Sequence, residues 1–123
     1  MKTIYFIDDQ SRTGESWVRR GKESGGLFRV IHFLSPFRFE EYLVENKIEE
    51  QAYIVADKNG PSFDNSKGFV PLVYTHIPNF KGTLVLVSST FDSESSPKAE
   101  GFHHCFYKRY ALEQIKELIK NEK

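Results

Sequence analysis

Acidic, hydroxyl and ammonium side chains follow four separate apolar runs of the sequence, each at the point where the run ends. In chain order they are Asp8 with Asp9, Asp57, Ser88 and Lys108. Carboxylate oxygens are the ligands that Mg²⁺ prefers, and an ammonium group with a hydroxyl can hold the oxygens of a phosphoryl group. A fold that brings these side chains together would therefore contain the groups needed to bind a divalent cation and a phosphoryl group.

The apolar runs have the length and composition of buried strands, and amphipathic segments separate them. Strands are expected at 2–7, 27–34, 52–56, 83–87 and 103–107. Helices are expected at 11–23, 35–46 and 110–121, with a short or irregular helix within 62–81 and at most a helical turn in 91–101. Strands that alternate with helices indicate an α/β fold with a parallel sheet. In such sheets ligands bind at the carboxyl ends of the strands, where the polar residues stand.

Two helix starts carry capping residues. Ser11 is expected to cap the first helix, with Asp8 and Asp9 just ahead of its positive end. Ser35 is followed by Pro36, a hydroxyl cap with proline in the first turn, which is typical of a helix start. The acidic pair is therefore expected to lie in the connection between the first strand and the first helix.

Composition favours one soluble domain, 1–123, in the cytoplasm. The sequence has 17 basic and 17 acidic residues, a balance that favours neither nucleic acid nor a membrane surface as partner. No apolar segment has the length of a membrane span or of a secretory signal. The single cysteine, Cys105, excludes an intrachain disulfide and is expected in the core as part of the last strand.

Each polar residue has an ordinary interpretation when it is taken alone. An acidic pair between a strand and a helix often stabilises the positive N-terminal end of that helix. Asp57 could simply begin the turn that follows it. Ser88 could belong to a polar loop and Lys108 could be a solvated charge. His103 and His104 lack a third ligand at a matching spacing, so they are interpreted as ordinary strand or surface residues. The combination, and no single residue, favours a site.

The combination resembles the receiver domain of response regulators, the phospho-acceptor half of bacterial two-component signalling. That family has an acidic pair after strand one, a phosphorylated aspartate after strand three, a Ser or Thr after strand four and a Lys after strand five. Residues of the same type stand in the same order here: Asp8 with Asp9, Asp57, Ser88 and Lys108. Pro61 and Asp64 also match the family loop that follows the phosphorylated aspartate.

The resemblance implies a flavodoxin-like (βα)5 three-layer sandwich with a five-stranded parallel sheet in the order 2-1-3-4-5. The prolines and serines of this sequence predict that its third helix is irregular and its fourth helix short or missing. The resemblance also implies Mg²⁺ bound by Asp8, Asp9, Asp57 and the backbone carbonyl of Asn59. Asp57 would accept a phosphoryl group from a histidine kinase or a histidine phosphotransfer protein, while Ser88 and Lys108 would hold its oxygens. Ser89 or Thr90 would replace Ser88 if the strand ended one residue later.

On this interpretation the protein is a stand-alone phosphorelay receiver and not an enzyme beyond its own phosphorylation and dephosphorylation. It would switch an interaction with an unknown downstream protein. Three residues differ from those usual in the family: Arg109 replaces a proline, Cys105 an aromatic residue and Asn65 a glycine. These differences put in doubt whether the protein passes its signal to a downstream protein in the family's usual way.

Two alternatives remain open, and these differences favour the first of them. One is a receiver-like interaction module that works without phosphorylation. The other is a phosphatase of the haloacid-dehalogenase type. That phosphatase needs a second aspartate two residues after its nucleophile, and Gln10 stands there after Asp8.

Overall fold

The computed structural model describes residues 1–57, 68–89 and 101–122, which form five strands and four helices. The strands are β1 (Lys2–Ile7), β2 (Phe28–Phe33), β3 (Tyr53–Asp57), β4 (Thr83–Ser88) and β5 (His104–Tyr107). The helices are α1 (Ser11–Lys22), α2 (Pro36–Glu45), α3 (Phe69–His76) and α4 (Ala111–Lys120). Within these described ranges no helix is long and apolar enough to cross a membrane.

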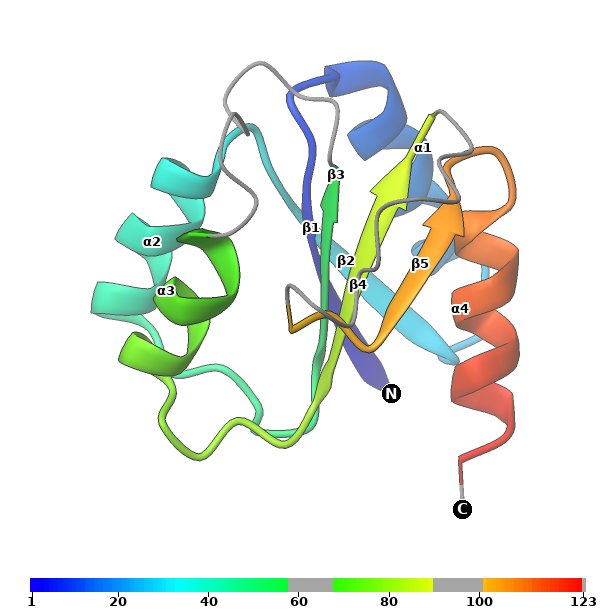
Figure 1. Ribbon diagram of the computed structural model, residues 1–123. Helices are drawn as coiled ribbons and strands as arrows, with labels where there is room; N and C mark the ends of the chain where they lie inside the picture. Colours follow the sequence, from blue (N-terminus) through cyan, green and yellow to red (C-terminus); the bar gives the residue numbers. More distant parts are fainter. Residues whose placement is uncertain (58–67, 90–100, 123) are drawn as a thin grey trace.

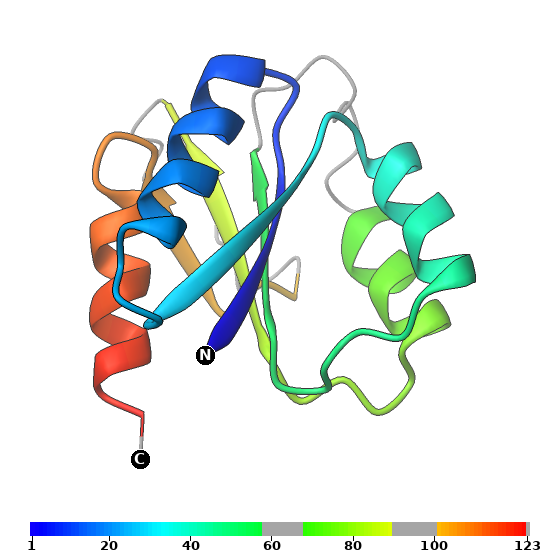
Figure 2. The same ribbon diagram turned by 180° about the vertical axis from the view of Figure 1, so that it is seen from behind.

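All five strands are parallel and form one sheet in the order β2-β1-β3-β4-β5. Helices α2 and α3 cover one face of the sheet, and α1 and α4 cover the other (Figures 1 and 2). The predicted α/β fold and strand order are confirmed. All the strands therefore end at the same edge of the sheet, which is where the polar residues of interest follow them.

The three central strands, β1, β3 and β4, send alternate side chains into two separate cores, one on either face of the sheet. In β1, Ile4 and Phe6 pack with Trp17 of α1, while Tyr5 and Ile7 pack on the side of α2 and α3. Strands β3 and β4 alternate in the same way, with apolar residues on both faces. This double burial explains why these strands are continuous apolar runs. Packing on both faces also fixes the register that places the strand ends.

The element boundaries agree with the sequence-based expectations to within one or two residues. The expected short helix within 62–81 is α3, and Ser35 caps α2 by accepting a hydrogen bond from the Arg38 backbone N–H at 3.2 Å. The expected cap at Ser11 is wrong: Gln10 occupies the N-cap position, and its side chain makes no capping hydrogen bond. The helical turn expected in 91–101 falls outside the described residues, apart from Gly101.

The expected burial of Cys105 is also wrong, because its thiol is exposed. Side chains of β5 alternate, and Phe106 packs against the core beneath α4. Cys105 and Tyr107 therefore face the other side of the sheet. In the described part of the chain, no helix covers that face at β5, since α2 and α3 lie toward the opposite edge (Figure 1).

Gly82, just before β4, has no room for a side chain. A Cβ atom there would overlap the backbone oxygen of Ala52 and the ring of Phe80. That oxygen accepts a hydrogen bond from the Thr83 backbone N–H at 3.0 Å, so it cannot move without breaking the bond. We expect Gly82→Ala to lower the free energy of unfolding by about 3 kcal/mol, measured by urea denaturation.

Gly25→Ala is the control for this substitution. Gly25 has a φ of 70°, but nothing lies within 4 Å of an added Cβ, so only backbone strain of about 1 kcal/mol is expected. Equal losses for the two variants would contradict the steric explanation for Gly82.

Candidate functional site

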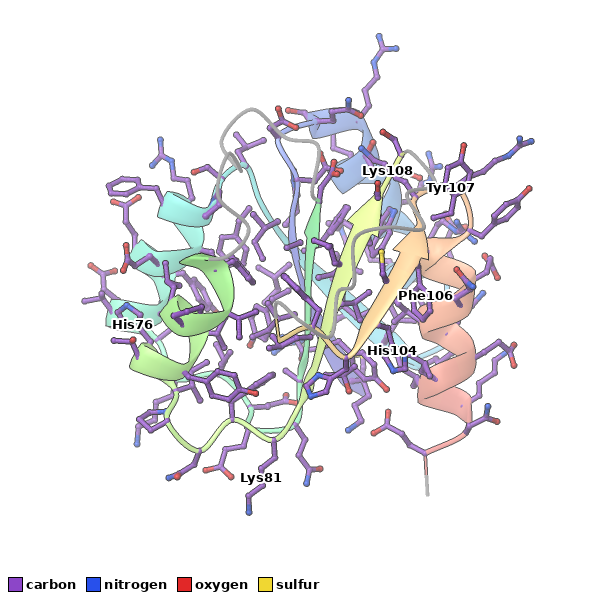
Figure 3. All side chains as sticks on the ribbon, viewed as in Figure 1. His76, Lys81, His104, Phe106, Tyr107 and Lys108 are labelled. Carbon is purple, nitrogen blue, oxygen red and sulfur yellow. The ribbon has the colours of Figure 1, made fainter. Side chains whose placement is uncertain are left out.

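The register of the sheet brings the ends of four strands to one place. Asp57, the last residue of β3, is the register partner of Val87 in β4, and Ser88 follows Val87. Ser88 is in turn the partner of Tyr107 in β5, and Lys108 comes next. The backbone N–H of Lys108 donates a hydrogen bond to the backbone carbonyl oxygen of Ser88 at 2.8 Å, which extends the pairing of β4 and β5 to Lys108. Figure 3 shows Lys108 at the carboxyl ends of the strands, opposite Lys81 at the other end of the sheet.

Three acidic residues meet at this edge. Asp8, Asp9 and Asp57 each offer a carboxylate oxygen, and these oxygens lie within 4.8 Å of one another. Asp8 is 1% exposed and Asp57 2% exposed, while Asp9 is half-buried. The structure therefore places together the three acids that the sequence analysis selected.

Lys108 lies between two of these carboxylates. Its Nζ atom is 2.9 Å from Asp57 Oδ2 and 3.1 Å from Asp8 Oδ2. It also donates to Gln10 Oε1 at 3.2 Å. The ammonium group therefore donates hydrogen bonds to Asp57 and Gln10 and forms an ion pair with Asp8 at the carboxyl ends of the strands.

Burial and neighbouring charges oppose each other at Asp8 and Lys108. Burial raises the pKa of Asp8 and the nearby Asp57 charge adds to this, and together they outweigh the Gln10 backbone N–H and the Lys108 ammonium, which lower it. Burial alone would lower the pKa of Lys108, but its hydrogen bond to Asp57 and its attraction to the Asp57 and Asp8 charges outweigh burial and raise it. Lys108 is thus firmly protonated, while the ionised form of Asp8 is destabilised.

One oxygen of Asp8 is incompletely satisfied. Asp8 Oδ1 accepts a hydrogen bond from the Gln10 backbone N–H at 2.8 Å. Asp8 Oδ2 is buried and accepts no hydrogen bond of good geometry, and its contact with Lys108 is an ion pair. A buried carboxylate oxygen without such a bond, beside two further carboxylates, fits a hard divalent cation.

The remaining expected site residues are divided between described and undescribed positions. Ser88 ends β4 and is buried, whereas Ser89 is exposed. Of these two hydroxyl residues, Ser88 is therefore the one that belongs to the buried end of the sheet where the acids lie. Thr90 and Asn59 fall outside the described residues, as do Pro61 and Asp64 of the loop after Asp57.

Sequence reasoning missed two residues that contact the site. It considered Gln10 only as the wrong residue for a phosphatase, yet Gln10 Oε1 accepts from both Lys108 and the Thr13 hydroxyl. His32, the last but one residue of β2, lies with Nε2 2.7 Å from the backbone oxygen of Asp8. The contacts of Gln10 with Lys108 and of His32 with Asp8 have no local sequence signal, because each joins positions that are distant in the chain.

Comparison with known proteins identifies the fold. No protein-family model and no curated protein matches the sequence. A CheY-like response-regulator receiver domain from Methanospirillum hungatei JF-1 matches the structure with a TM-score of 0.73 at 17% identity, over 98% of this chain and 94% of that chain. This chain has the receiver-domain fold.

Two further solved receiver structures are relevant. The response regulator TrrA from Thermotoga maritima, in complex with Mg²⁺–BeF, matches with a TM-score of 0.73 at 13% identity, over 98% of this chain and 97% of that chain. A chain in a structure of the CheA3 P1 domain in complex with CheY6 from R. sphaeroides matches with a TM-score of 0.68 at 13% identity, over 98% of the present chain and 98% of that matching chain. The likeness holds along nearly the whole receiver fold at low sequence identity.

We expect Asp8→Asn to stabilise the metal-free protein at neutral pH by about 1 kcal/mol. Because burial raises the pKa of Asp8 above its ordinary 3.8, the folded chain holds this proton more tightly than the unfolded chain. The wild-type carboxyl therefore destabilises the fold increasingly as the pH rises from the ordinary value through the raised pKa. Asparagine does not titrate, and Lys108 keeps its pairing with Asp57.

Urea unfolding of both proteins in the presence of a chelator, from acid to neutral pH, measures this difference. The advantage of Asp8→Asn should be smallest in acid and should grow toward neutrality. A difference that does not change with pH would contradict the electrostatic origin. Asp9→Asn is the control and should have a smaller effect, because Asp9 is less buried.

Proposed function

We propose that the protein is a phospho-acceptor receiver in a phosphorelay. In this proposal Asp57 accepts a phosphoryl group with the help of Mg²⁺, and the phosphorylated form switches a protein–protein interaction. The observation that carries the proposal is the position of Lys108, within 3.1 Å of Asp57 and Asp8 at the edge where three carboxylates converge.

The arrangement supplies positioning and charge, which is what phosphoryl transfer to a weak nucleophile requires. A carboxylate oxygen of Asp57 attacks the phosphorus of a phosphohistidine, and the phosphorus–nitrogen bond to the donor histidine breaks. Lys108, already 2.9 Å from Asp57 Oδ2, offsets the negative charge of the phosphoryl oxygens. Ser88, one residue beyond the register partner of Asp57, donates a hydrogen bond from its hydroxyl to one of these oxygens.

The candidate cation ligands are the three carboxylates of Asp8, Asp9 and Asp57, with the backbone carbonyl of Asn59. When bound, Mg²⁺ would neutralise charge on the carboxylates and on the phosphoryl oxygens. The buried Asp8 Oδ2 without a well-aligned hydrogen bond supports this ligand set. The Mg²⁺–BeF complex of TrrA, a protein of the same fold, also supports it.

The proposed phosphoryl donor is a histidine kinase or a histidine phosphotransfer protein. The complex between the CheA3 P1 domain and CheY6 supports a partner of the histidine-kinase type. An acyl phosphate on Asp57 carries about −1.5 to −2 charges where the carboxylate carried one, and its oxygens extend toward Ser88 and Lys108, which can bias a neighbouring loop between two states. The downstream partner is a protein that distinguishes those two states.

A second candidate is a receiver-like interaction module that works without phosphate. The surface beside Lys108 favours it: Arg109 lies over the Tyr110 ring at 5.8 Å, and Tyr107 and Tyr110 are partly exposed. Aromatic residues next to a cation are common where proteins bind each other. This surface is compatible with both candidates, so phosphorylation itself must distinguish them.

We expect the wild-type protein, incubated with acetyl phosphate and Mg²⁺, to gain the mass of one phosphoryl group. Asp57→Asn should abolish the gain, because it removes the nucleophile, and a chelator should abolish it in the wild type. Glu117→Gln changes an exposed acid in the last turn of α4 that is not part of the candidate site, and this variant should label like the wild type. Intact-protein mass spectrometry in acid measures all of these outcomes.

Two results would overturn the proposal. One is a wild-type protein that takes up no phosphoryl group from acetyl phosphate or phosphoramidate and shows no response to beryllofluoride with Mg²⁺. That result would favour the phosphate-independent module. The other is an equal mass gain in Asp57→Asn, which would place the modification on a different residue.

A further inference from the structure

His32 of β2 reaches the backbone of the acidic pair. Its Nε2 atom lies 2.7 Å from the backbone oxygen of Asp8. A carbonyl oxygen can only accept a hydrogen bond, so Nε2 must carry the proton and donate it. This contact joins a side chain of the edge strand to the turn between β1 and α1.

The hydrogen bond stands where backbone pairing between β1 and β2 stops. The strands are in register up to Ile7 and Phe33, and the Asp8 backbone N–H still donates to the Phe33 oxygen at 3.0 Å. In a parallel ladder the Asp8 oxygen would next accept a backbone N–H from the neighbouring strand. The chain instead bends at Leu34 toward α2, and the imidazole of His32 supplies the donor.

The His32 ring is held on two sides. It lies 5.9 Å from the Phe6 ring, its register partner in β1. On the other side it contacts Gly14 of α1, where an added Cβ atom would overlap the ring. Glycine costs about 1 kcal/mol relative to alanine within a helix, so its presence here is explained by the space that the ring needs.

We propose that His32 is a positioning residue of the acidic site, and this inference rests on the proposed function. By donating to the Asp8 oxygen, His32 fixes the peptide plane between Asp8 and Asp9. That plane sets the direction in which both carboxylates leave the backbone. His32 therefore holds the acidic pair in the arrangement that binds a cation, without touching the cation itself.

The test compares a variant that loses the donor with one that keeps it. His32→Phe retains a ring of similar size but has no N–H group, whereas His32→Gln retains an N–H donor at similar reach. Calorimetric titration with Mg²⁺ should show binding about tenfold or more weaker for His32→Phe, the usual effect of losing a hydrogen bond behind a metal ligand. His32→Gln should stay within about threefold of the wild type, because its donor replaces the imidazole.

The metal-free proteins provide a second measurement. The amide N–H of Asp9 belongs to the peptide group that His32 binds, so its ¹H–¹⁵N chemical shift reports the orientation of that group. We expect this signal to move in His32→Phe and to stay near the wild-type position in His32→Gln. Thermal unfolding establishes that each variant is folded.

The outcomes separate the two proposals. Equal Mg²⁺ affinity in the wild type and His32→Phe overturns the role of His32, and so does an equal loss in both variants, which would assign the effect to ring packing. A wild-type protein that binds no Mg²⁺ overturns the proposed function. In that case the Asp9 amide shift still decides whether His32 positions the turn.

Gly14→Ala tests the same contact from the opposite side, and it replaces His32→Phe if that variant does not fold. Its methyl group would displace the imidazole, so we expect a similar loss of Mg²⁺ affinity. When His32 is also changed to Ala, the methyl group has room and Gly14→Ala should cost nothing further. If the double variant bound Mg²⁺ more weakly than His32→Ala alone, by as much as Gly14→Ala weakens the wild type, the contact between Gly14 and the His32 ring would not explain the effect.

Discussion

The candidate site depends on one ammonium group placed between buried carboxylates. Lys108 Nζ lies 2.9 Å from Asp57 and 3.1 Å from Asp8, and both acids are almost fully buried. Among the residues that the structure describes, Asp9 joins Asp8 and Asp57 in facing this one ammonium, which leaves an excess of negative charge at the carboxyl ends of the strands. Charge repulsion at such short range is strong away from bulk water. The arrangement is therefore electrostatically incomplete, and a divalent cation is the ligand that would complete it.

The parallel sheet makes this arrangement possible. Lys108 and Asp57 are 51 positions apart in the sequence, and only the adjacency of β3, β4 and β5 brings them together. Because apolar residues fill both faces of the central strands, a shift of one residue would turn each side chain to the wrong core. The same packing that stabilises the fold thus fixes the carboxylate and ammonium positions. His32 applies the equivalent constraint where the pairing between β1 and β2 ends.

The sequence predicted most of this because the relevant signals are local. Buried strands are continuous apolar runs, the polar residues stand at their ends, and the Ser35 cap is followed by proline. The two errors arise where local patterns are insufficient. Ser11 is a good capping residue, but the turn at Asp8 and Gln10 begins the helix one residue earlier, and the exposure of Cys105 depends on which helices cover β5. The contacts of His32 and Gln10 are tertiary and leave no periodic or spacing signal.

The cost of the buried acids helps to choose between the two candidate functions. A module that bound partners without phosphate would be more stable with a neutral residue at Asp8, because this buried carboxylate lies beside Asp57 and burying like charges opposes folding. Two of the three departures from the receiver pattern, Arg109 and Cys105, lie on β5 and just after it, and neither is one of the acids or a residue of the candidate site; the third, Asn65, is outside the described residues. The acidic edge and the altered surface are thus physically separable. A phospho-acceptor with an unusual partner-binding surface accounts for both, whereas a phosphate-independent module leaves the charges unexplained.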